Sequence, residues 1–354
     1  CQRSLERTSR SRHDGGGAAI FLRQDMAMGY HKTVLVHVAQ KFNIPDELAN
    51  GPMTSAEIAA AVKSEASIVE RLMFACAANG VFKLTKPAAD GSPRFVNTAL
   101  SAVLRKDHPN SQWAMVAHNA EDVLGAWAKL PEVFANPSGP IAWDLANPAY
   151  PFKKGGIWKL FEDKPEREAQ FAAAMTSLDS LGANAMVADG PWAKFAGKTV
   201  HDVGGGQGHF MHRILAAHPS IKGVVVDRPP VIELAKKAYG AGGPFSSVAG
   251  GRIGFVGGSF FEPKTIPPAQ SDGDAYFMRY ILHDWPRKDA LKILKNVRAA
   301  MGDKKATLVV GECALPDHHV VGVPPVMYGI DIQMLAAFGE AQERTPAQWK
   351  EIFA

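Results

Sequence analysis

Residues 199–208 of this 354-residue chain read TVHDVGGGQG, and this stretch decides the fold class. Its first five residues have the character of a buried β-strand, and that strand runs directly into glycines. Residues 209–217 follow with the apolar spacing of a helix. Glycine at such a junction adopts positive φ without steric cost and lets a ligand approach the backbone closely. The stretch therefore predicts an α/β domain that binds a ligand at this turn.

The alternation of strands and helices continues toward the end of the chain. We expect further strands at residues 223–227, 252–256, 275–279 and 306–311, with helices that begin at residue 230 and span residues 289–301. This spacing indicates a mostly parallel sheet covered on both faces, with ligands beyond the carboxyl ends of the strands. Asp227 ends the strand after the glycine turn, where a carboxylate can accept hydrogen bonds from both ribose hydroxyls of a nucleotide.

The first half of the chain is rich in helix signals. Residues 54–57 read TSAE, which is the spacing of a helix capping box. A second helix is expected over residues 67–79, and strands at residues 81–84 and 94–96 are joined by a turn that contains Asp-Gly. Helix, turn, helix and hairpin in this order are a winged-helix pattern.

A winged-helix pattern raises the possibility of DNA binding. The helix over residues 67–79 would then be the recognition helix, but its only basic residue is Arg71. Its apolar stripe, predicted at Ile68, Leu72 and Ala75, favours packing or dimerisation instead. We therefore expect no nucleic-acid partner and keep a DNA-binding regulator as an alternative.

The composition is that of an ordinary globular protein, with 46% hydrophobic and 21% charged residues. The net charge of 39 − 35 = +4 permits a nucleic-acid partner without calling for one. Three cysteines far apart in sequence make no disulfide framework and fit a reducing, cytoplasmic location. The absence of CxxC or HExxH spacing predicts no metal site, and no apolar run is long enough for a membrane helix.

We expect three parts in the chain. Residues 1–18, rich in Arg, Ser and Gly, are predicted to be a disordered tail, with an organelle transit remnant as the alternative. Residues 19–110 form the helical winged-helix-like domain, and residues 111–354 hold the α/β domain. Within the latter, residues 166–186 predict one long amphipathic helix.

Five motifs occur in an order that resembles a known family. They are DVGGGQG at 202–208, DRPPVI at 227–232, HDW at 283–285, GEC at 311–313 and ERT at 343–345. In this order they resemble the S-adenosylmethionine-dependent O-methyltransferases of the caffeic-acid/hydroxyindole type. The resemblance runs from about residue 25 to the end of the chain. It implies a winged-helix-like dimerisation domain and a Rossmann-like methyltransferase domain. It also implies a homodimer, a small aromatic hydroxyl substrate, and S-adenosylmethionine as donor with S-adenosylhomocysteine as product.

The same resemblance implies the residues of the donor site. The three alternate glycines of the turn would approach the methionine part, and Asp227 would hold the ribose. Ser259 stands where most members have an Asp on the adenine amine, and a neutral hydroxyl loses a charge-assisted hydrogen bond there. The complete donor set is Asp202, Gly204, Gly206, Gly208, Asp227, Ser259, Phe260, which would cover the adenine ring, and Arg279, where many members have Lys.

His283 is the predicted general base. A phenol with a pKa of about 10 is protonated at neutral pH, so a group that accepts its proton during methyl transfer is useful. Neutral imidazole suits that task, and His283 follows the strand over residues 275–279 at the carboxyl end of the sheet. The resemblance places Glu312 and Glu343 beside it as acids that orient the ring. A structural His that caps a strand end is the alternative.

Other residues receive weaker predictions. Met334 matches a family Met that packs on the acceptor ring, and Met175 is predicted as its counterpart across the pocket, with core packing equally open for both. His201 lies inside the strand before the glycines and is expected to be a hydrogen-bonded core or edge residue. His209 is expected at a helix start near the cofactor.

Two further alternatives concern the reaction and the chain. Some relatives of this type use the bound cofactor in hydroxylation or decarboxylation, whereas a nicotinamide oxidoreductase is disfavoured because His209 occupies the third glycine position of its fingerprint. The chain ends at Ala354, where members of the resembled family continue into two further strands. We therefore expect a truncated product with an exposed edge strand at residues 306–311.

Overall fold

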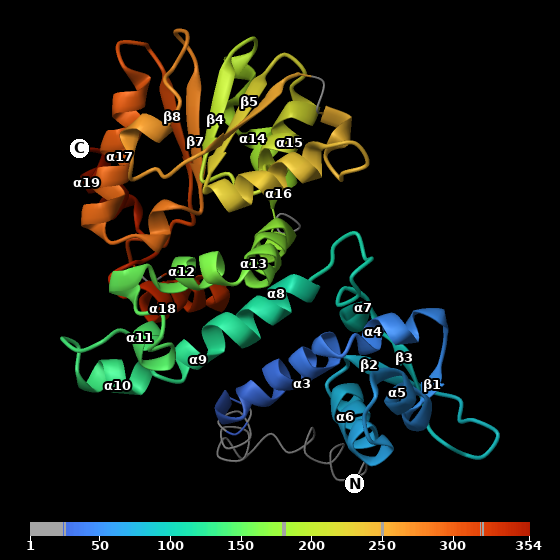
Figure 1. Cartoon of the computed structure of the whole chain (residues 1–354). Coiled ribbons are helices and arrows are strands. Elements are labelled where there is room, and N and C mark those ends of the chain that lie inside the picture. The colour runs from blue at the N-terminus through green and yellow to red at the C-terminus, as the bar shows by residue number, and fades with distance from the viewer. Residues whose placement is uncertain (1–23, 25, 179–181, 249–250, 319, 321) are drawn as a thin grey trace. The chain divides into compact units, whose positions relative to one another are not determined.

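The computed structural model describes residues 24, 26–178, 182–248, 251–318, 320 and 322–354. The chain divides into two compact units, Cys1–Ala120 and Glu121–Ala354 (Figure 1). The predicted tail of residues 1–18 lies outside the described residues. Within the described residues, no helix is both long enough and apolar enough to cross a membrane.

The first unit has the predicted helix-and-hairpin order. Its elements are α3 (Gly29–Lys41), α4 (Ile44–Glu47), β1 (Met53–Thr54), α5 (Ser55–Val62), α6 (Ala66–Ala78), β2 (Phe82–Thr85), β3 (Arg94–Asn97), α7 (Ala99–Ala102) and α8 (Trp113–His118). The strands form an antiparallel sheet in the order β1-β3-β2. The predicted capping box is present, because Thr54 Oγ1 accepts from the Glu57 backbone N–H while the Glu57 side chain accepts from that of Thr54.

The apolar stripe predicted on α6 is wrong by one residue. Ile68 is 57% exposed, whereas Val69, Met73 and Cys76 are buried in the core of the first unit. The predicted row and the buried row both repeat at helical spacing. The period cannot choose between them, because α6 is apolar over most of its circumference. The packing of α5 and the small sheet, rather than the period, therefore selects the buried row.

The second unit contains the predicted parallel sheet (Figure 1). In its described residues the strands are β4 (Thr199–Val203), β5 (Lys222–Asp227), β6 (Ile253–Gly257), β7 (Ala275–Arg279) and β8 (Thr307–Gly311). They pair in the order β6-β5-β4-β7-β8, and every pairing is parallel. This confirms the predicted α/β fold with a helical domain before it.

Helices cover both faces of this sheet. On one face, α15 (His209–Ala217) and α16 (Pro229–Tyr239) pack on a core that includes Val200 of β4. On the other face, α17 (Arg287–Met301) packs on a core that includes Val203. The two valines are three residues apart in an extended strand and so point to opposite faces. Because every pairing in the sheet is parallel, all the strands have their carboxyl ends at one edge. The loops that leave this edge carry the predicted site residues.

The second unit contains further helices. They are α9 (Leu124–Trp127), α10 (Leu130–Ala135), α11 (Ala142–Ala146), α12 (Gly156–Asp163), α13 (Pro165–Leu178), α14 (Ala183–Asp189), α18 (Pro325–Phe338) and α19 (Pro346–Phe353). Of these, α14 packs on the core that includes Val200 and α19 on the core that includes Val203. The single helix predicted over residues 166–186 is wrong, because α13 and α14 are separate. The backbone of Gly182, just before α14, has φ 173° and ψ −1°, which lies outside the helical region. A continuous apolar pattern therefore did not mean a continuous helix.

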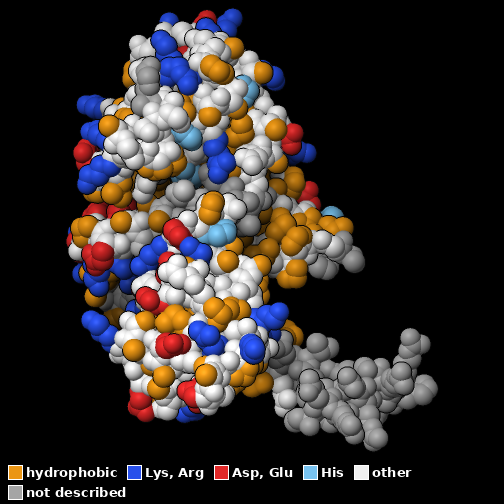
Figure 2. Space-filling view, turned by 90° about the vertical axis from the view of Figure 1, so that its right-hand side faces the viewer, with side chains coloured by type: hydrophobic (Ala, Val, Ile, Leu, Met, Phe, Trp, Pro, Cys, Tyr) orange, Lys and Arg blue, Asp and Glu red, His pale blue; other side chains and the backbone are white. Residues whose placement is uncertain are grey.

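Charged side chains are dispersed over the molecule. On the face shown in Figure 2, the Lys and Arg side chains of the described residues lie among acidic ones and do not gather into a stripe. This agrees with the small net charge of +4.

Candidate active site

The glycine turn after β4 has the geometry predicted from the sequence. Gly204, Gly206 and Gly208 have φ of +79°, +59° and +77°, a region that L-residues with side chains rarely adopt. A Cβ on Gly204 would also lie 2.4 Å from Cδ1 of Ile281. Ile281 belongs to the loop after β7, so the turn predicted to bind the donor touches the loop that carries His283.

Asp227, at the end of β5, is fixed by this turn. Its Oδ2 accepts from the Gly206 backbone N–H at 2.8 Å, and its Oδ1 accepts from the Arg228 N–H at 2.7 Å. Burial raises the pKa of Asp227, while these two N–H groups oppose that rise. Because an ionised carboxylate oxygen can accept two hydrogen bonds, each oxygen retains a position for a ribose hydroxyl. The residues present therefore fit a nucleoside at this strand end.

Two more predicted donor residues lie at the same edge. The carboxyl group of Asp202 lies beneath the turn, since a Cβ on Gly205 would come within 2.6 Å of its Cγ. An Nη of Arg279 lies 3.0 Å from Nε2 of His209, the first residue of α15. The prediction that His209 begins a helix is confirmed. Its partner, Arg279, belongs to the predicted donor set.

Ser259 and Phe260 follow β6 in a tight turn. The Ser259 hydroxyl accepts from the Phe261 backbone N–H at 3.2 Å, so one of its acceptor positions serves its own turn. The Phe260 ring meets Trp285 edge-on, with ring centroids 5.8 Å apart. Trp285 belongs to the HDW motif, so this contact joins the predicted adenine wall to the loop of His283.

His283 lies in the 3-10 turn Leu282–Asp284 beyond β7. Its Nδ1 is 2.7 Å from Oε1 of Glu343, a side chain that is 1% exposed. Its Nε2 is 3.5 Å from Oδ1 of Asp284. A carboxylate on Nδ1 fixes the tautomer of the ring and leaves Nε2 as the nitrogen that can exchange a proton with a substrate.

Glu312 acts mainly on the backbone that carries the imidazole. Its Oε1 accepts from the N–H groups of Ile281 at 3.0 Å and Leu282 at 2.7 Å. Its Oε2 is 3.9 Å from Nδ1 of His283, which is beyond hydrogen-bond distance. The two predicted orienting acids therefore differ: Glu343 contacts the ring directly, whereas Glu312 holds the turn.

The electrostatic state of His283 differs from the neutral imidazole expected from the sequence. Burial lowers the pKa of His283, but Asp284, Glu343 and Glu312 raise it to about 10. Burial raises the pKa of Asp284 to about 7, against the opposing charge of His283. The three acids therefore favour the imidazolium form of His283. Asp284 was missed as a site residue, although its position next to His283 in the HDW motif was the available signal.

Arg344 was also missed. Its side chain is buried, and its Nη1 and Nη2 donate at 2.7 Å to the carbonyl oxygens of Leu282 and Trp285, one on each side of His283 and Asp284. The fork of the guanidinium suits two such acceptors. Nothing local in the sequence reveals this contact, because the partners are about sixty residues apart.

His201 is buried, but it does not make the hydrogen bonds expected of it. Its ring stacks on Tyr276 with centroids 4.7 Å apart, and within the described part of the chain neither ring nitrogen has a hydrogen-bond partner. Burial lowers the pKa of His201, which favours the neutral ring. It is a core residue that contributes no contact to the predicted site.

The two predicted acceptor residues have different surroundings. Met334 is buried on α18 in a cluster with Trp143, Phe161 and Phe338. Met175 lies half-buried on α13 and is not part of that cluster. The structure therefore does not bring the pair into direct contact.

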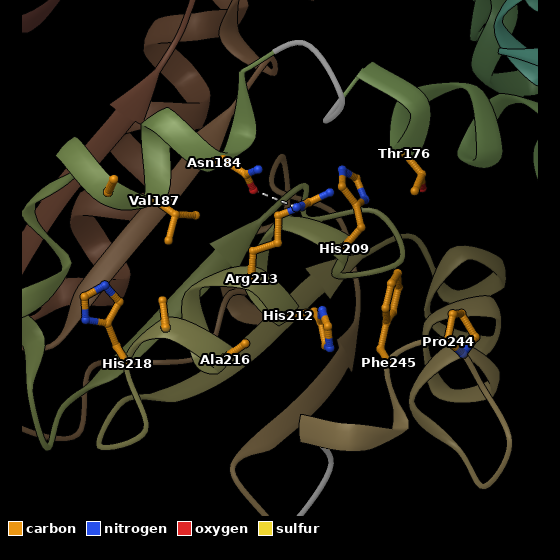
Figure 3. A pocket seen from close by; sticks show the side chains of 12 residues that line it. Thr176, Asn184, Val187, His209, His212, Arg213, Ala216, His218, Pro244 and Phe245 are labelled. Carbon is orange, nitrogen blue, oxygen red and sulfur yellow. Dashed lines mark hydrogen bonds between the residues drawn. The ribbon is translucent and has the colours of Figure 1, made fainter. Parts of the chain in front are cut away.

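A pocket of about 730 Å³ lies along α15 (Figure 3). In Figure 3, Arg213 of α15 reaches across to Asn184 of α14 and donates to its Oδ1 at 2.9 Å. None of the predicted donor, catalytic or acceptor residues lines this pocket. His209 lines it and also contacts Arg279, so the pocket adjoins the predicted site without containing it. In the described ranges, no group of three or more His, Cys, Asp and Glu side chains is arranged to hold a metal ion.

Known proteins share both units of this chain. Residues 127–354 match the model of an O-methyltransferase domain, and residues 24–107 match that of the O-methyltransferase dimerisation domain. The chain is 33% identical to a phenazine O-methyltransferase of Lysobacter antibioticus over 93% of this chain and 88% of that protein. It is 32% identical to an 8-amino-8-demethylriboflavin N,N-dimethyltransferase of Streptomyces davaonensis over 90% and 84%.

A solved structure is similar over most of its length. It is an O-methyltransferase from neocarzinostatin biosynthesis in complex with S-adenosylmethionine and 2-hydroxy-5-methyl naphthoic acid. The TM-score is 0.69 at 25% identity, with 90% of this chain and 88% of that chain covered. The residues for which DNA binding was an alternative fall inside the segment that matches the dimerisation domain.

Proposed function

Because the chain belongs to the S-adenosylmethionine-dependent O-methyltransferase family, as its five ordered motifs predicted, we propose that it methylates a hydroxyl oxygen of a small aromatic metabolite. Members of this family transfer methyl groups to small metabolites, and most act on aromatic hydroxyls. One relative described above is an N,N-dimethyltransferase, so the acceptor atom has to be argued from this chain's own site.

The observation that supports oxygen is the imidazole of His283, fixed by Glu343 at 2.7 Å. A phenol must lose a proton as it attacks, because its pKa is about 10. An aromatic amine attacks through its lone pair and needs no base before the bond forms. A histidine held with Nε2 available at the carboxyl end of the sheet therefore favours a hydroxyl acceptor.

In the proposed reaction, the acceptor oxygen bonds to the methyl carbon as the carbon–sulfur bond breaks, and Nε2 of His283 receives the hydroxyl proton. S-adenosylmethionine, when bound, supplies the methyl group and a positive sulfonium charge. A positive charge near an imidazolium lowers the pKa of the ring. We therefore expect His283, whose pKa is raised to about 10 in this structure, to lose its proton only with the donor in place.

The donor site is proposed at the glycine turn. Its three alternate glycines would contact the methionine part, and Asp227 would hold the ribose. Ser259 and Phe260 would contact the adenine, and Asp202 and Arg279 would support the turn and the methionine end. The support comes from the positive φ of the turn and the hydrogen bond between Gly206 and Asp227.

The acceptor site and the assembly are also part of the proposal. Met334 and Met175 would pack against the acceptor ring, for which flexible thioethers are suited. We propose that the helical domain ends near residue 110 and that it forms a homodimer. The match of residues 24–107 to the dimerisation domain supports this assembly.

Two measurements test the proposed function. Calorimetric titration with S-adenosylhomocysteine should show binding to the unsubstituted protein, and its absence would contradict the donor site. Labelled S-adenosylmethionine should then methylate phenols in a panel that pairs each phenol with the corresponding aniline. His283→Ala should lose phenol methylation while it keeps S-adenosylhomocysteine binding. Methylation of anilines alone, or full activity of His283→Ala, would overturn the proposed oxygen chemistry.

A further inference from the structure

Arg228 joins the proposed ribose acid to a helix from another part of the second unit. Its backbone N–H donates to Asp227 Oδ1 at 2.7 Å. Its Nη1 and Nη2 donate to Oε2 and Oε1 of Glu168 on α13, at 3.0 and 2.5 Å. The guanidinium also lies over the ring of Trp158 on α12, 5.5 Å from its centroid. One residue therefore contacts the strand end, α12 and α13.

The charges in this contact depend on one another. The side chain of Glu168 is 4% exposed and that of Arg228 is 23% exposed. Burial raises the pKa of Glu168 and Asp227 raises it further, while Arg228 opposes both effects. Arg228 likewise opposes the rise in the pKa of Asp227. The Arg228 guanidinium thus stabilises the carboxylates of both Glu168 and Asp227. A change at either carboxylate alters the interaction of the guanidinium with the remaining one.

Glu168 shares a face of α13 with residues of the proposed acceptor wall. Glu168, Phe171 and Met175 are three and seven positions apart, which places them on one side of a helix. Phe171 stacks on Phe161 with ring centroids 4.8 Å apart, and it packs against the cluster that contains Met334. Figure 1 shows α12, α13 and α18 grouped together below the sheet. The ion pair therefore holds the helix that carries one proposed acceptor contact and adjoins the other.

We propose that the Arg228–Glu168 pair transmits donor binding at Asp227 to α13 and so positions the acceptor wall. The inference rests on the proposed function, since it takes Asp227 as the ribose acid. Ribose hydroxyls on Asp227 would leave its Oδ1 bonded to the Arg228 N–H and would fix the backbone from which the guanidinium extends. A fixed guanidinium holds Glu168, and through it α13. Arg228 and Glu168 are positioning residues in this account and touch neither reactant.

Hydrogen exchange of the α13 amides, with S-adenosylhomocysteine as the probe, tests the proposal without an identified acceptor. In the unsubstituted protein, saturation with S-adenosylhomocysteine should slow the exchange of α13 amides at least about fivefold, the lower end of usual coupling between sites. Glu168→Gln should still bind S-adenosylhomocysteine but lose this slowing. Arg228→Lys keeps the positive charge but lacks the forked guanidinium, and it should lose part of the slowing of α13 exchange.

The matched control is an exposed pair on the neighbouring helix. Lys159 and Asp163 on α12 are 2.7 Å apart with side chains 45% and 43% exposed, so Asp163→Asn removes an exposed acid that pairs with Lys159. This variant should keep the full response of α13. With a phenol acceptor from the panel, Glu168→Gln should raise the acceptor KM and change kcat less.

Each outcome is decisive. A response of α13 in Glu168→Gln equal to that of the unsubstituted protein would overturn the proposed transmission. The proposal would also be overturned if the α13 amides of Glu168→Gln exchanged faster than those of the unsubstituted protein by the same factor with and without S-adenosylhomocysteine. That result would show that the pair only stabilises the structure. Absence of S-adenosylhomocysteine binding to the unsubstituted protein would instead overturn the proposed function, and this inference with it.

Discussion

Glu343→Gln tests the electrostatic account of His283 most directly. The substitution keeps the shape of the side chain and removes the charge that lies 2.7 Å from Nδ1. Hydrogen bonds to charged groups contribute about 1.5–3 kcal/mol. Since one pH unit in a pKa corresponds to about 1.36 kcal/mol, we expect the pKa of His283 to fall by about one to two pH units.

The sign of the effect on stability follows from the same pKa. The pKa of His283 is raised from 6.5 to about 10 in the folded protein, so the folded state holds this proton more tightly than the unfolded chain does. The resulting stability is fully present below pH 6.5 and is lost as the pH rises toward 10. Glu343→Gln should therefore reduce the free energy of unfolding at neutral pH and flatten its decline on the alkaline side.

The assay is an NMR titration of histidine-labelled protein, combined with urea unfolding at several pH values. Phenol methylation should fall by about a hundredfold, because the base loses the group that orients it. Glu351→Gln is the matched control, since Glu351 is 66% exposed and pairs only at the surface with Arg287, 2.9 Å away. An unchanged pKa of His283 in Glu343→Gln, or an equal change in Glu351→Gln, would refute the reasoning.

Three further substitutions test the turn and the core. Gly204→Ala should destabilise the protein by about 1–2 kcal/mol in urea unfolding, because φ is +79° and the new Cβ would lie 2.4 Å from Ile281 Cδ1; unchanged stability would contradict the close contact. Tyr239→Phe should lower the free energy of unfolding by about 1 kcal/mol, because the Tyr239 hydroxyl donates to the Gly208 carbonyl at 2.7 Å; an unchanged free energy would show that this hydrogen bond does not stabilise the protein. Burial lowers the pKa of His201 below 6.5, so the unfolded chain binds this proton first and stability falls as the pH drops below about 6.5. His201→Phe should lessen that loss between pH 7.5 and 5, and equal pH slopes would show that His201 is not its source.

The sheet and its glycine turn could be predicted because their signals are local. The strands Thr199–Val203 and Ala275–Arg279 and the helix His209–Ala217 have the predicted bounds. Parallel strands buried on both faces appear in sequence as continuous apolar runs bounded by turn residues. The glycines are equally local, since positive φ is a property of single residues.

Patterns with two equivalent solutions were not resolved by the sequence. On α6 the rows of Ile68 and Val69 are both apolar at helical spacing, and only the neighbouring elements decide which row is buried. The amphipathic pattern of residues 166–186 is compatible with one helix or two, and the non-helical backbone at Gly182 precedes α14. Periodicity fixes a residue's place within an element but not the surface against which the element packs.

The sequence by itself predicted the fold class, the donor turn and the candidate base His283, because each is marked by residue type and local spacing, whereas Glu312 and Glu343 were predicted from the resemblance to the family. Only the tertiary structure decided that Glu343 binds the ring while Glu312 binds the backbone of the same turn. Only it brought Glu343 and Glu312 close enough to add to the effect of the adjacent Asp284, and the three acids together raise the pKa of His283. The physical reason is that charge interactions and hydrogen bonds act over a few ångströms, and those distances depend on how segments far apart in the chain pack together.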